Sequence, residues 1–440
     1  MPDSNLVDKR RRTLSWVAGL SAATMLFDGY DLVVYGTVVP TLLADPSQIG
    51  HVSPEQAGAL GSYALIGVMV GALTAGAIGD WLGRRVLMLI NMIWFSLGMG
   101  LTSFTHSTTT FGLGRFVTGI GIGALIVTVG ALIAEFAKPE QKNRLNAIVY
   151  SGVPAGGVLA ALLALRLGGG EGWRTLFLIG AVPLVTLLPL AVWKLPESPR
   201  WLLARGRKEE AVALAGRLGT DLPLLDTEAG KVGFGVLASR PFAWPTALLG
   251  MMSFAGLLLT YGLNTWLPQI MGANGYGKNY ALTFLLVLNL GAILGGIAAS
   301  YVADRLGSAK RVVVTTFVLA ACTLLLLPLD LPFAVLMLSV ALAGTGTLGT
   351  QVLIYGLVSN YYPTRARAAG VSWCAGFGRL GGILGPAIGG VLVASGIGGS
   401  RAFMIFAAVS LVGAVVAALV PRSAASDVVI APHAAQSATI

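Results

Sequence analysis

The chain has 440 residues, of which 55% are hydrophobic and only 11% are charged, and its mean hydropathy is +0.79. An ordinary soluble domain carries about 25% charged residues, so this composition excludes a soluble enzyme, a disordered chain and a coiled coil. The formal net charge of +10 points to anionic lipid or nucleic acid, or to an uneven distribution of basic residues across a membrane.

Twelve apolar runs follow one another along the chain, and each is long enough to cross a bilayer core as a helix. We expect these helices at roughly 14–43, 56–80, 86–105, 110–135, 143–166, 173–193, 243–270, 280–303, 311–329, 332–358, 368–395 and 400–420. The sequence therefore predicts an all-α membrane protein. Its predicted parts are an N-terminal six-helix bundle (1–193), a cytoplasmic linker with short amphipathic helices (194–242), a C-terminal six-helix bundle (243–420) and a cytoplasmic tail (421–440).

The basic residues indicate the orientation. Most of the 29 Lys and Arg residues lie in one set of loops, in the linker and near the two ends of the chain. Because basic loops stay in the cytoplasm, we expect both termini to be cytoplasmic. Lys9 to Arg12 precede the first run as in a signal peptide, but that run is too long and contains two Asp residues, so we expect an uncleaved first helix.

Cysteine and histidine counts restrict the chemistry further. Cys322 and Cys374 both lie inside apolar runs, which excludes a disulfide framework. The three His and two Cys residues are far apart in the sequence, so we expect no metal site and no cofactor. No basic stretch alternates with aromatic residues, which excludes a nucleic-acid surface.

The two halves share residues at a constant offset, which indicates an internal repeat. The matched pairs are Asp80 and Asp304, Gly83 and Gly307, Pro139 and Pro363, Gly152 and Gly376, and Gly157 and Gly381. Two parallel six-helix repeats predict a substrate site between the halves near the midplane, with alternating access by rocking.

Several motifs resemble those of the major facilitator superfamily. The loop after the second helix is similar to its signature loop, with the pattern Gly76-x3-Asp80-x2-Gly83-Arg84-Arg85. A weaker copy in the second half is Ser300-x3-Asp304-x2-Gly307-x2-Lys310-Arg311. Also typical are Pro196-Glu-Ser-Pro-Arg-Trp-Leu202 and Arg115-x3-Gly119-x-Gly121-x-Gly123. The resemblance covers most of the chain and implies the major facilitator fold.

The first helix resembles a particular family within this superfamily. Its pattern Asp28-Gly29-Tyr30-Asp31 is similar to the Asp-Gly-x-Asp signature of aromatic acid:proton symporters, which carry benzoate, hydroxybenzoates and related acids into bacteria. The embedded charges Arg115, Glu135 and Arg379 also match that family. The resemblance implies a monomeric importer in the bacterial plasma membrane, whose partners are a small aromatic carboxylate, a proton and membrane lipid.

Charged residues at membrane depth are costly, so each is a functional hypothesis. Asp28 and Asp31 are three residues apart and share a helix face. Two such carboxylates do not both stay ionised without a cation, which predicts proton coupling; the alternative is a permanent Asp–Arg pair that holds helices together. For Arg379 we predict a contact with the substrate carboxylate, or else with Asp28 or Asp31. Arg115 is predicted to pair with an Asp of the first helix or to help transfer a proton.

Gating and substrate-binding roles are predicted for two further groups. The gating candidates are Asp80, Gly83, Arg84, Arg85, Glu135, Arg144, Asp304 and Arg311, with Asp80 pairing across the halves and Glu135 close to Arg144. The substrate-binding candidates are Arg379, Arg115, Tyr30, Phe377, Asn264 and Trp266, with Tyr35, Tyr261, Tyr355 and Trp373 as weaker ones. For most of these aromatic residues, packing or an interfacial belt is the simpler interpretation.

The alternatives differ in substrate or in class. An importer of shikimate or muconate fits the same charges, and a drug:proton antiporter fits them less well. A membrane sensor is expected to carry a folded cytoplasmic domain, and an enzyme a nucleophile motif or a His cluster. ATP coupling is unsupported because the chain has no G-x4-G-K-[ST] motif.

Overall fold

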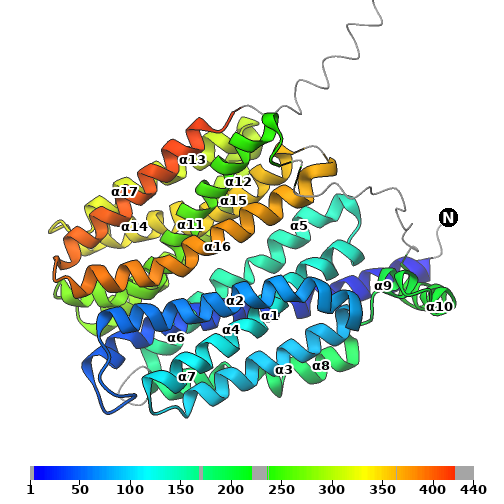
Figure 1. The fold of residues 1–440 in the computed structure, drawn as a ribbon, viewed down its shortest axis with the longest axis horizontal. Coiled ribbons are helices and arrows are strands. Elements are labelled where there is room, and N and C mark those ends of the chain that lie inside the picture. Colours follow the sequence, from blue (N-terminus) through cyan, green and yellow to red (C-terminus); the bar gives the residue numbers. More distant parts are fainter. Residues whose placement is uncertain (1–3, 168–171, 221–234, 236, 363, 422–440) are drawn as a thin grey trace, which may run out of the picture. The chain divides into compact units, whose positions relative to one another are not determined.

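The computed structural model describes residues 4–167, 172–220, 235, 237–362 and 364–421, and these are helical almost throughout (Figure 1). Twelve segments in them are long and apolar enough to cross a membrane, which confirms the predicted number. The chain divides into two compact units, 1–227 and 228–440, each with six such spans. The predicted tail 422–440 and the repeat residue Pro363 lie outside the described residues.

Unit 1 contains helices α1 to α10. Four of its spans are single helices, and the fifth and sixth are broken into shorter pieces. The helices are α1 (Ser4–Ala44), α2 (Pro54–Leu82), α3 (Arg84–Ser103), α4 (Thr108–Phe136), α5 (Pro139–Tyr150), α6 (Gly152–Leu167), α7 (Gly172–Ile179), the 3-10 turn η1 (Val182–Leu184), α8 (Leu187–Lys194), α9 (Pro199–Ala204) and α10 (Lys208–Leu218).

Unit 2 contains helices α11 to α17. The tenth span of the chain, which lies in this unit, is interrupted by a π-helical turn that the sequence did not predict. The helices are α11 (Arg240–Ala273), α12 (Lys278–Leu306), α13 (Ala309–Leu326), α14 (Phe333–Gly344), the π turn η3 (Thr345–Gly349), α15 (Thr350–Tyr361), α16 (Thr364–Ala394) and α17 (Gly398–Leu419).

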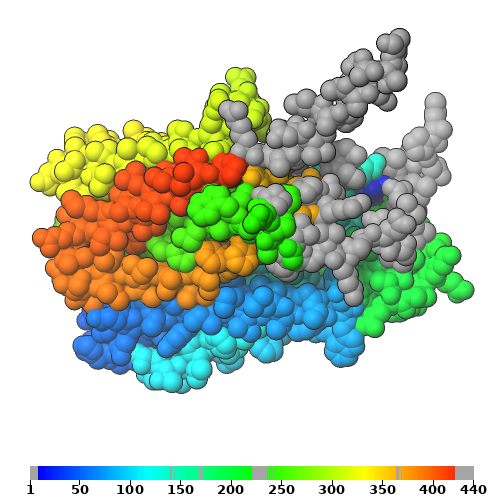
Figure 2. Space-filling model, turned by 45° about the horizontal axis from the view of Figure 1, so that its top comes forward, coloured from blue at the N-terminus to red at the C-terminus, as the bar shows by residue number. Residues whose placement is uncertain are grey.

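The two units pack their helices in the same order, as the repeat predicts. In unit 1, α1 packs along α6 and α2 along α4; in unit 2, α11 packs along α16 and α12 along α14. Figure 2 shows α11 (green) and α16 (orange) side by side. Gly83 and Gly307 end the second span of their units with positive φ, at 94° and 59°. Both conformations favour glycine, but ψ differs, at 160° for Gly83 and 21° for Gly307, so the two turns are not identical.

Small residues allow these helix pairs to approach closely, as is common in membranes. A Cβ built on Gly67 would lie 2.1 Å from the Phe116 carbonyl oxygen, and one on Gly123 would lie 2.0 Å from that of Val68. In unit 2, a Cβ on Gly381 would lie 2.1 Å from the Phe254 carbonyl oxygen. Backbone-to-backbone contact between spans therefore explains much of the high glycine content.

The first part of the predicted linker packs on unit 1. Helices α9 and α10 contact each other, and α10 also contacts α1. Their buried residues Leu202, Ala211 and Ala215 form an apolar side, so the predicted amphipathic helices are present. Figure 1 shows this pair at the end of unit 1 where α1 begins. The division between the units falls inside the predicted linker 194–242, whose limits stay a prediction.

Candidate functional site

The Asp-Gly-x-Asp pattern lies where α1 touches α6. A Cβ on Gly29 would lie 1.8 Å from the Val153 carbonyl oxygen, and one on Gly156 would lie 1.9 Å from that of Leu26. No side chain fits at either position, so the glycine between the two Asp residues has a packing reason. This contact fixes the part of α1 that carries Asp28 and Asp31.

Asp31 and Arg115 form a buried ion pair. The guanidinium of Arg115 in α4 donates to an Asp31 carboxylate oxygen, and each residue is 3% exposed. Aromatic rings cover the guanidinium, whose central carbon lies 5.0 Å from the Tyr35 ring centroid and 5.8 Å from that of Phe177. Arg115 therefore pairs with an Asp of the first helix, as predicted.

Asp28 and Tyr30 stand in different surroundings from Asp31. Asp28 is half-buried, which makes it the more accessible of the two carboxylates. The Tyr30 side chain is fully buried, and its hydroxyl donates to the Leu176 carbonyl oxygen at 2.6 Å. Tyr30 thus ties α1 to α7, and its substrate-binding role stays a prediction.

Unit 2 places Arg379 in α16 among small residues and rings. Its guanidinium donates to the Tyr261 hydroxyl of α11 at 3.3 Å. A Cβ on the neighbouring Gly382 would lie 3.0 Å from the Tyr261 ring. The rings of Trp373 and Phe377, six and two residues before Arg379, stack with centroids 5.4 Å apart. Half-buried Arg379 and Phe377 thus bring a cation and a flat apolar surface to one stretch of α16.

Asn264 and Trp266 are both buried in α11. The Asn264 side chain donates to the Thr260 carbonyl oxygen and accepts from Asn289 of α12 at 2.9 Å. The Trp266 indole donates to the Pro386 carbonyl oxygen at 2.8 Å and packs on Gly389 of α16. Both residues join helices of unit 2, and their contact with substrate stays a prediction.

The signature loop forms a compact charged cluster in unit 1. Arg84 donates to Asp80 at 2.9 Å and to Glu135 of α4 at 3.3 Å. The predicted neighbour of Glu135 was Arg144, but Arg144 is exposed and makes no ion pair within the described residues. Arg84 reaches Glu135 because positive φ at Gly83 turns the chain sharply into α3. The pairing expected between Glu135 and Arg144 was therefore wrong.

Glu197 is a residue of this cluster that the sequence did not single out. One of its carboxylate oxygens accepts from the backbone N–H groups of Arg84 and Arg85, at 2.9 and 3.2 Å. A carboxylate at the first turn of α3 is favourable, because free N–H groups and the positive end of the helix dipole lie there. The signal was present, since Glu197 belongs to the Pro-Glu-Ser-Pro pattern after the sixth span.

The remaining gating candidates have weaker partners. Arg85 donates to the Val192 carbonyl oxygen at 2.6 Å and ties α3 to α8. Asp304 and Arg311 are exposed, and neither makes an ion pair within the part of unit 2 that the structure describes. The second copy of the signature loop thus lacks the charge cluster of the first.

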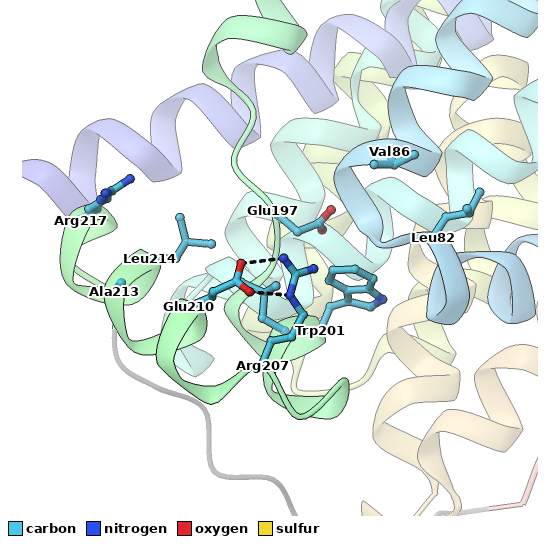
Figure 3. Close-up of a pocket in the computed structure, with 10 residues that line it drawn as sticks. Leu82, Val86, Glu197, Trp201, Arg207, Glu210, Ala213, Leu214 and Arg217 are labelled. Atoms are coloured by element: carbon cyan, nitrogen blue, oxygen red, sulfur yellow. Dashed lines mark hydrogen bonds and ion pairs between the residues drawn. The ribbon is translucent and has the colours of Figure 1, made fainter.

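A pocket of about 470 Å³ lies beside this cluster, between α10 and the ends of α2 and α3 (Figure 3). Arg207 donates to both carboxylate oxygens of Glu210, at 2.7 and 2.6 Å. These hydrogen bonds hold the pKa of Glu210 below its ordinary value. The contribution of this pair to stability is therefore present at neutral pH and is lost as the pH falls through the lowered pKa.

Among the described residues, no three His, Cys, Asp or Glu side chains gather as metal ligands. What the structure does gather are a buried ion pair between α1 and α4, an arginine among rings in α16 and glycine-lined helix contacts, in two units with the same helix order. The model of the Major Facilitator Superfamily matches residues 20–365 and 289–439. The chain belongs to the major facilitator superfamily.

Curated relatives narrow the family further. A gentisate transporter of Corynebacterium glutamicum is 32% identical, with 95% of this chain and 92% of the relative aligned. A benzoate transport protein of Acinetobacter baylyi is 33% identical over 88% of this chain and 85% of the relative. A gallate transporter of Pseudomonas putida is 33% identical over 85% of this chain and 84% of the relative. The predicted placement among the aromatic-acid transporters is confirmed, and the protein is a multi-pass membrane transporter, not an enzyme.

Solved structures agree on the fold. A partially occluded, inward-open xylose transporter XylE from E. coli superposes with a TM-score of 0.75 at 18% identity, over 93% of this chain and 98% of the other. This likeness establishes the major facilitator fold and carries nothing about substrate.

Proposed function

We propose that this transporter imports aromatic carboxylates of the benzoate or hydroxybenzoate type together with protons, by alternating access. The observation that carries the proposal is the pair of carboxylates on one face of α1, one of them buried against Arg115. The names of the curated relatives, which include gentisate, benzoate and gallate transporters, support the substrate class.

Proton coupling is assigned to Asp28 and Asp31. A buried ion pair is costly to break, because each partner is left as an uncompensated charge. Protonation of Asp31 removes its charge and releases Arg115, so one proton changes how α1 and α4 are joined. Asp28, three residues away and less buried, is placed to exchange protons with water and to repel a charged Asp31.

The substrate carboxylate is assigned to Arg379. The planar guanidinium binds a carboxylate through two parallel hydrogen bonds, which a lysine ammonium does not do. Phe377 and Trp373 supply flat apolar surface on the same helix.

Gating is assigned to the cluster of Asp80, Arg84 and Glu135, together with Glu197. The contacts of this cluster join α2, α3 and α4 at one end of unit 1.

We expect the protein to be a monomer in the bacterial plasma membrane, with both termini in the cytoplasm. The basic residues of the signature loop and of the linker support this orientation, since basic loops stay inside. All three relatives described above come from bacteria.

Uptake of labelled acids by cells that express the chain tests the proposal. The panel contains benzoate, 4-hydroxybenzoate, gentisate, shikimate and cis,cis-muconate, each measured with and without an uncoupler. We expect uptake of the aromatic acids, abolished by the uncoupler. Uptake of shikimate or muconate alone, or faster exit of a lipophilic drug, would identify one of the alternatives instead.

A further inference from the structure

Gln351 is a buried polar residue to which the proposed mechanism gives no role. It lies in α15, two residues after the π turn η3, and is 3% exposed. Its amide nitrogen donates to the Ser253 hydroxyl of α11 at 2.9 Å. Its amide oxygen makes no hydrogen bond to any described residue. Since a buried acceptor left without a donor is costly, this oxygen requires an explanation.

The backbone around Gln351 is arranged to make room for this oxygen. A Cβ on Gly256 would lie 2.5 Å from it, so the oxygen approaches the backbone of α11 at a position where only glycine fits. The π turn before Gln351 is closed by Thr350, whose hydroxyl donates to the Thr345 carbonyl oxygen at 3.2 Å. Such turns insert one residue into a helix and often occur at functional sites.

The neighbours of Gln351 connect it to Arg379. Tyr355, one turn further along α15, brings its phenol close to Gln351 and Ser253, and Arg379 lies within electrostatic range of that phenol. A Cβ on Gly378, next to Arg379, would lie 2.3 Å from the Ser253 hydroxyl oxygen. One side of unit 2 thus holds Arg379, which is proposed to bind the substrate carboxylate, and, close by, the Gln351 amide oxygen, which accepts no hydrogen bond from a described residue.

We propose that the Gln351 amide oxygen accepts a hydrogen bond from a ring hydroxyl, which makes this residue select hydroxylated aromatic acids over benzoate. The inference rests on the proposed function of the same site. Benzoate has no ring donor and leaves the oxygen unsatisfied, whereas a hydroxybenzoate supplies the missing O–H. A site built to bond a substrate hydroxyl discriminates strongly against the analogue that lacks it.

Competing uptake of labelled benzoate and hydroxybenzoates into proteoliposomes with an imposed pH gradient tests this. For the wild type we expect kcat/KM for the best of 3-hydroxybenzoate, 4-hydroxybenzoate and gentisate to exceed that for benzoate by about tenfold or more, the cost of one unmade buried hydrogen bond. Gln351→Met keeps the size and removes the acceptor, so kcat/KM for the hydroxybenzoates should fall and their preference over benzoate should drop to about twofold.

Two further variants separate this role from general damage. Gln48→Met is the matched control, because Gln48 is also buried but its amide oxygen already accepts from the Trp173 indole at 2.7 Å. It should leave the substrate ratio unchanged. Gly256→Ala keeps Gln351 in the sequence but adds a methyl group that displaces its amide oxygen. This variant should therefore lower the ratio of hydroxybenzoate to benzoate transport.

The outcomes distinguish this inference from the function on which it rests. Equal transport of benzoate and all three hydroxybenzoates by the wild type, or an undiminished preference in Gln351→Met, would overturn the role of Gln351 alone. Failure of every aromatic acid to accumulate would overturn the proposed function and this inference together.

Discussion

At the scale of single residues, the buried charges are the features that distinguish this chain from a simple helical bundle. A pair between Arg115 and an Asp of the first helix was predictable, because an Arg and an Asp at membrane depth must find partners, but the choice of Asp31 over Asp28 was not. The contact between Arg84 and Glu135 was not, because it depends on the turn at Gly83. Gln351 escaped prediction as well, since its unpaired oxygen follows from the neighbouring helices and not from its own sequence context.

Substitution of the two carboxylates should separate coupling from structure. Asp28→Asn is expected to abolish accumulation against a gradient while exchange continues. Asp31→Asn should also abolish accumulation and, in addition, destabilise the protein by about 3–5 kcal/mol, because Arg115 is left buried without its partner. Accumulation assays and thermal unfolding in detergent measure the two effects.

The double variant Asp31→Asn with Arg115→Gln provides the control, because it removes both charges. It should recover most of the stability but none of the accumulation. Wild-type accumulation in both single variants would contradict the assignment of proton coupling to α1.

Arg379→Lys tests the carboxylate site. A point charge replaces the planar fork, so we expect the apparent KM for the transported acid to rise about tenfold, with normal expression. The KM is measured from uptake rates at increasing concentrations of the acid, under a pH gradient large enough that the gradient does not limit the rate. An unchanged KM would remove Arg379 from the substrate site.

At the scale of elements, glycine positions decide how the spans meet. The lengths and order of the twelve spans followed from apolar runs alone, whereas the breaks inside the fifth and sixth spans and the π turn η3 did not. The π turn lies in the run Gly344-Thr-Gly-Thr-Leu-Gly349, where a Cβ on Gly346 would lie 2.4 Å from the Thr316 carbonyl oxygen of α13. Only the neighbouring helix reveals that constraint, so tertiary packing determines the turn.

Two alanine substitutions on α1 test the close contact with α6. Gly29→Ala should destabilise the protein by at least about 1–3 kcal/mol, because its methyl group meets the Val153 carbonyl oxygen. Gly19→Ala lies on the same helix, exposed and with nothing within 4 Å of its Cβ, and should be neutral. Thermal unfolding in detergent compares them, and equal stability of the two variants would show that the contact is not required.

At the scale of the whole molecule, coupling determines which gradient drives transport. A benzoate-like anion carries one negative charge, and its inward movement against an inside-negative potential costs about 2.3 kcal/mol per 100 mV. One co-transported proton cancels that charge. Arg115 already neutralises Asp31, so the two carboxylates of α1 do not require two protons. We therefore expect one proton per substrate and electroneutral transport.

A potassium gradient with valinomycin tests this stoichiometry in proteoliposomes at equal pH on both sides. The inside-negative potential should leave uptake unchanged. Strong stimulation by the potential would indicate a second proton and cycling of both Asp28 and Asp31.

The most direct test of the account is accumulation of a labelled hydroxybenzoate in proteoliposomes that hold only the purified protein and an imposed pH gradient, acidic outside. The account predicts accumulation above the outside concentration, its collapse when a protonophore is added, and its absence in Asp28→Asn. Equilibration to the outside concentration at the same rate with and without the gradient would contradict proton-coupled import.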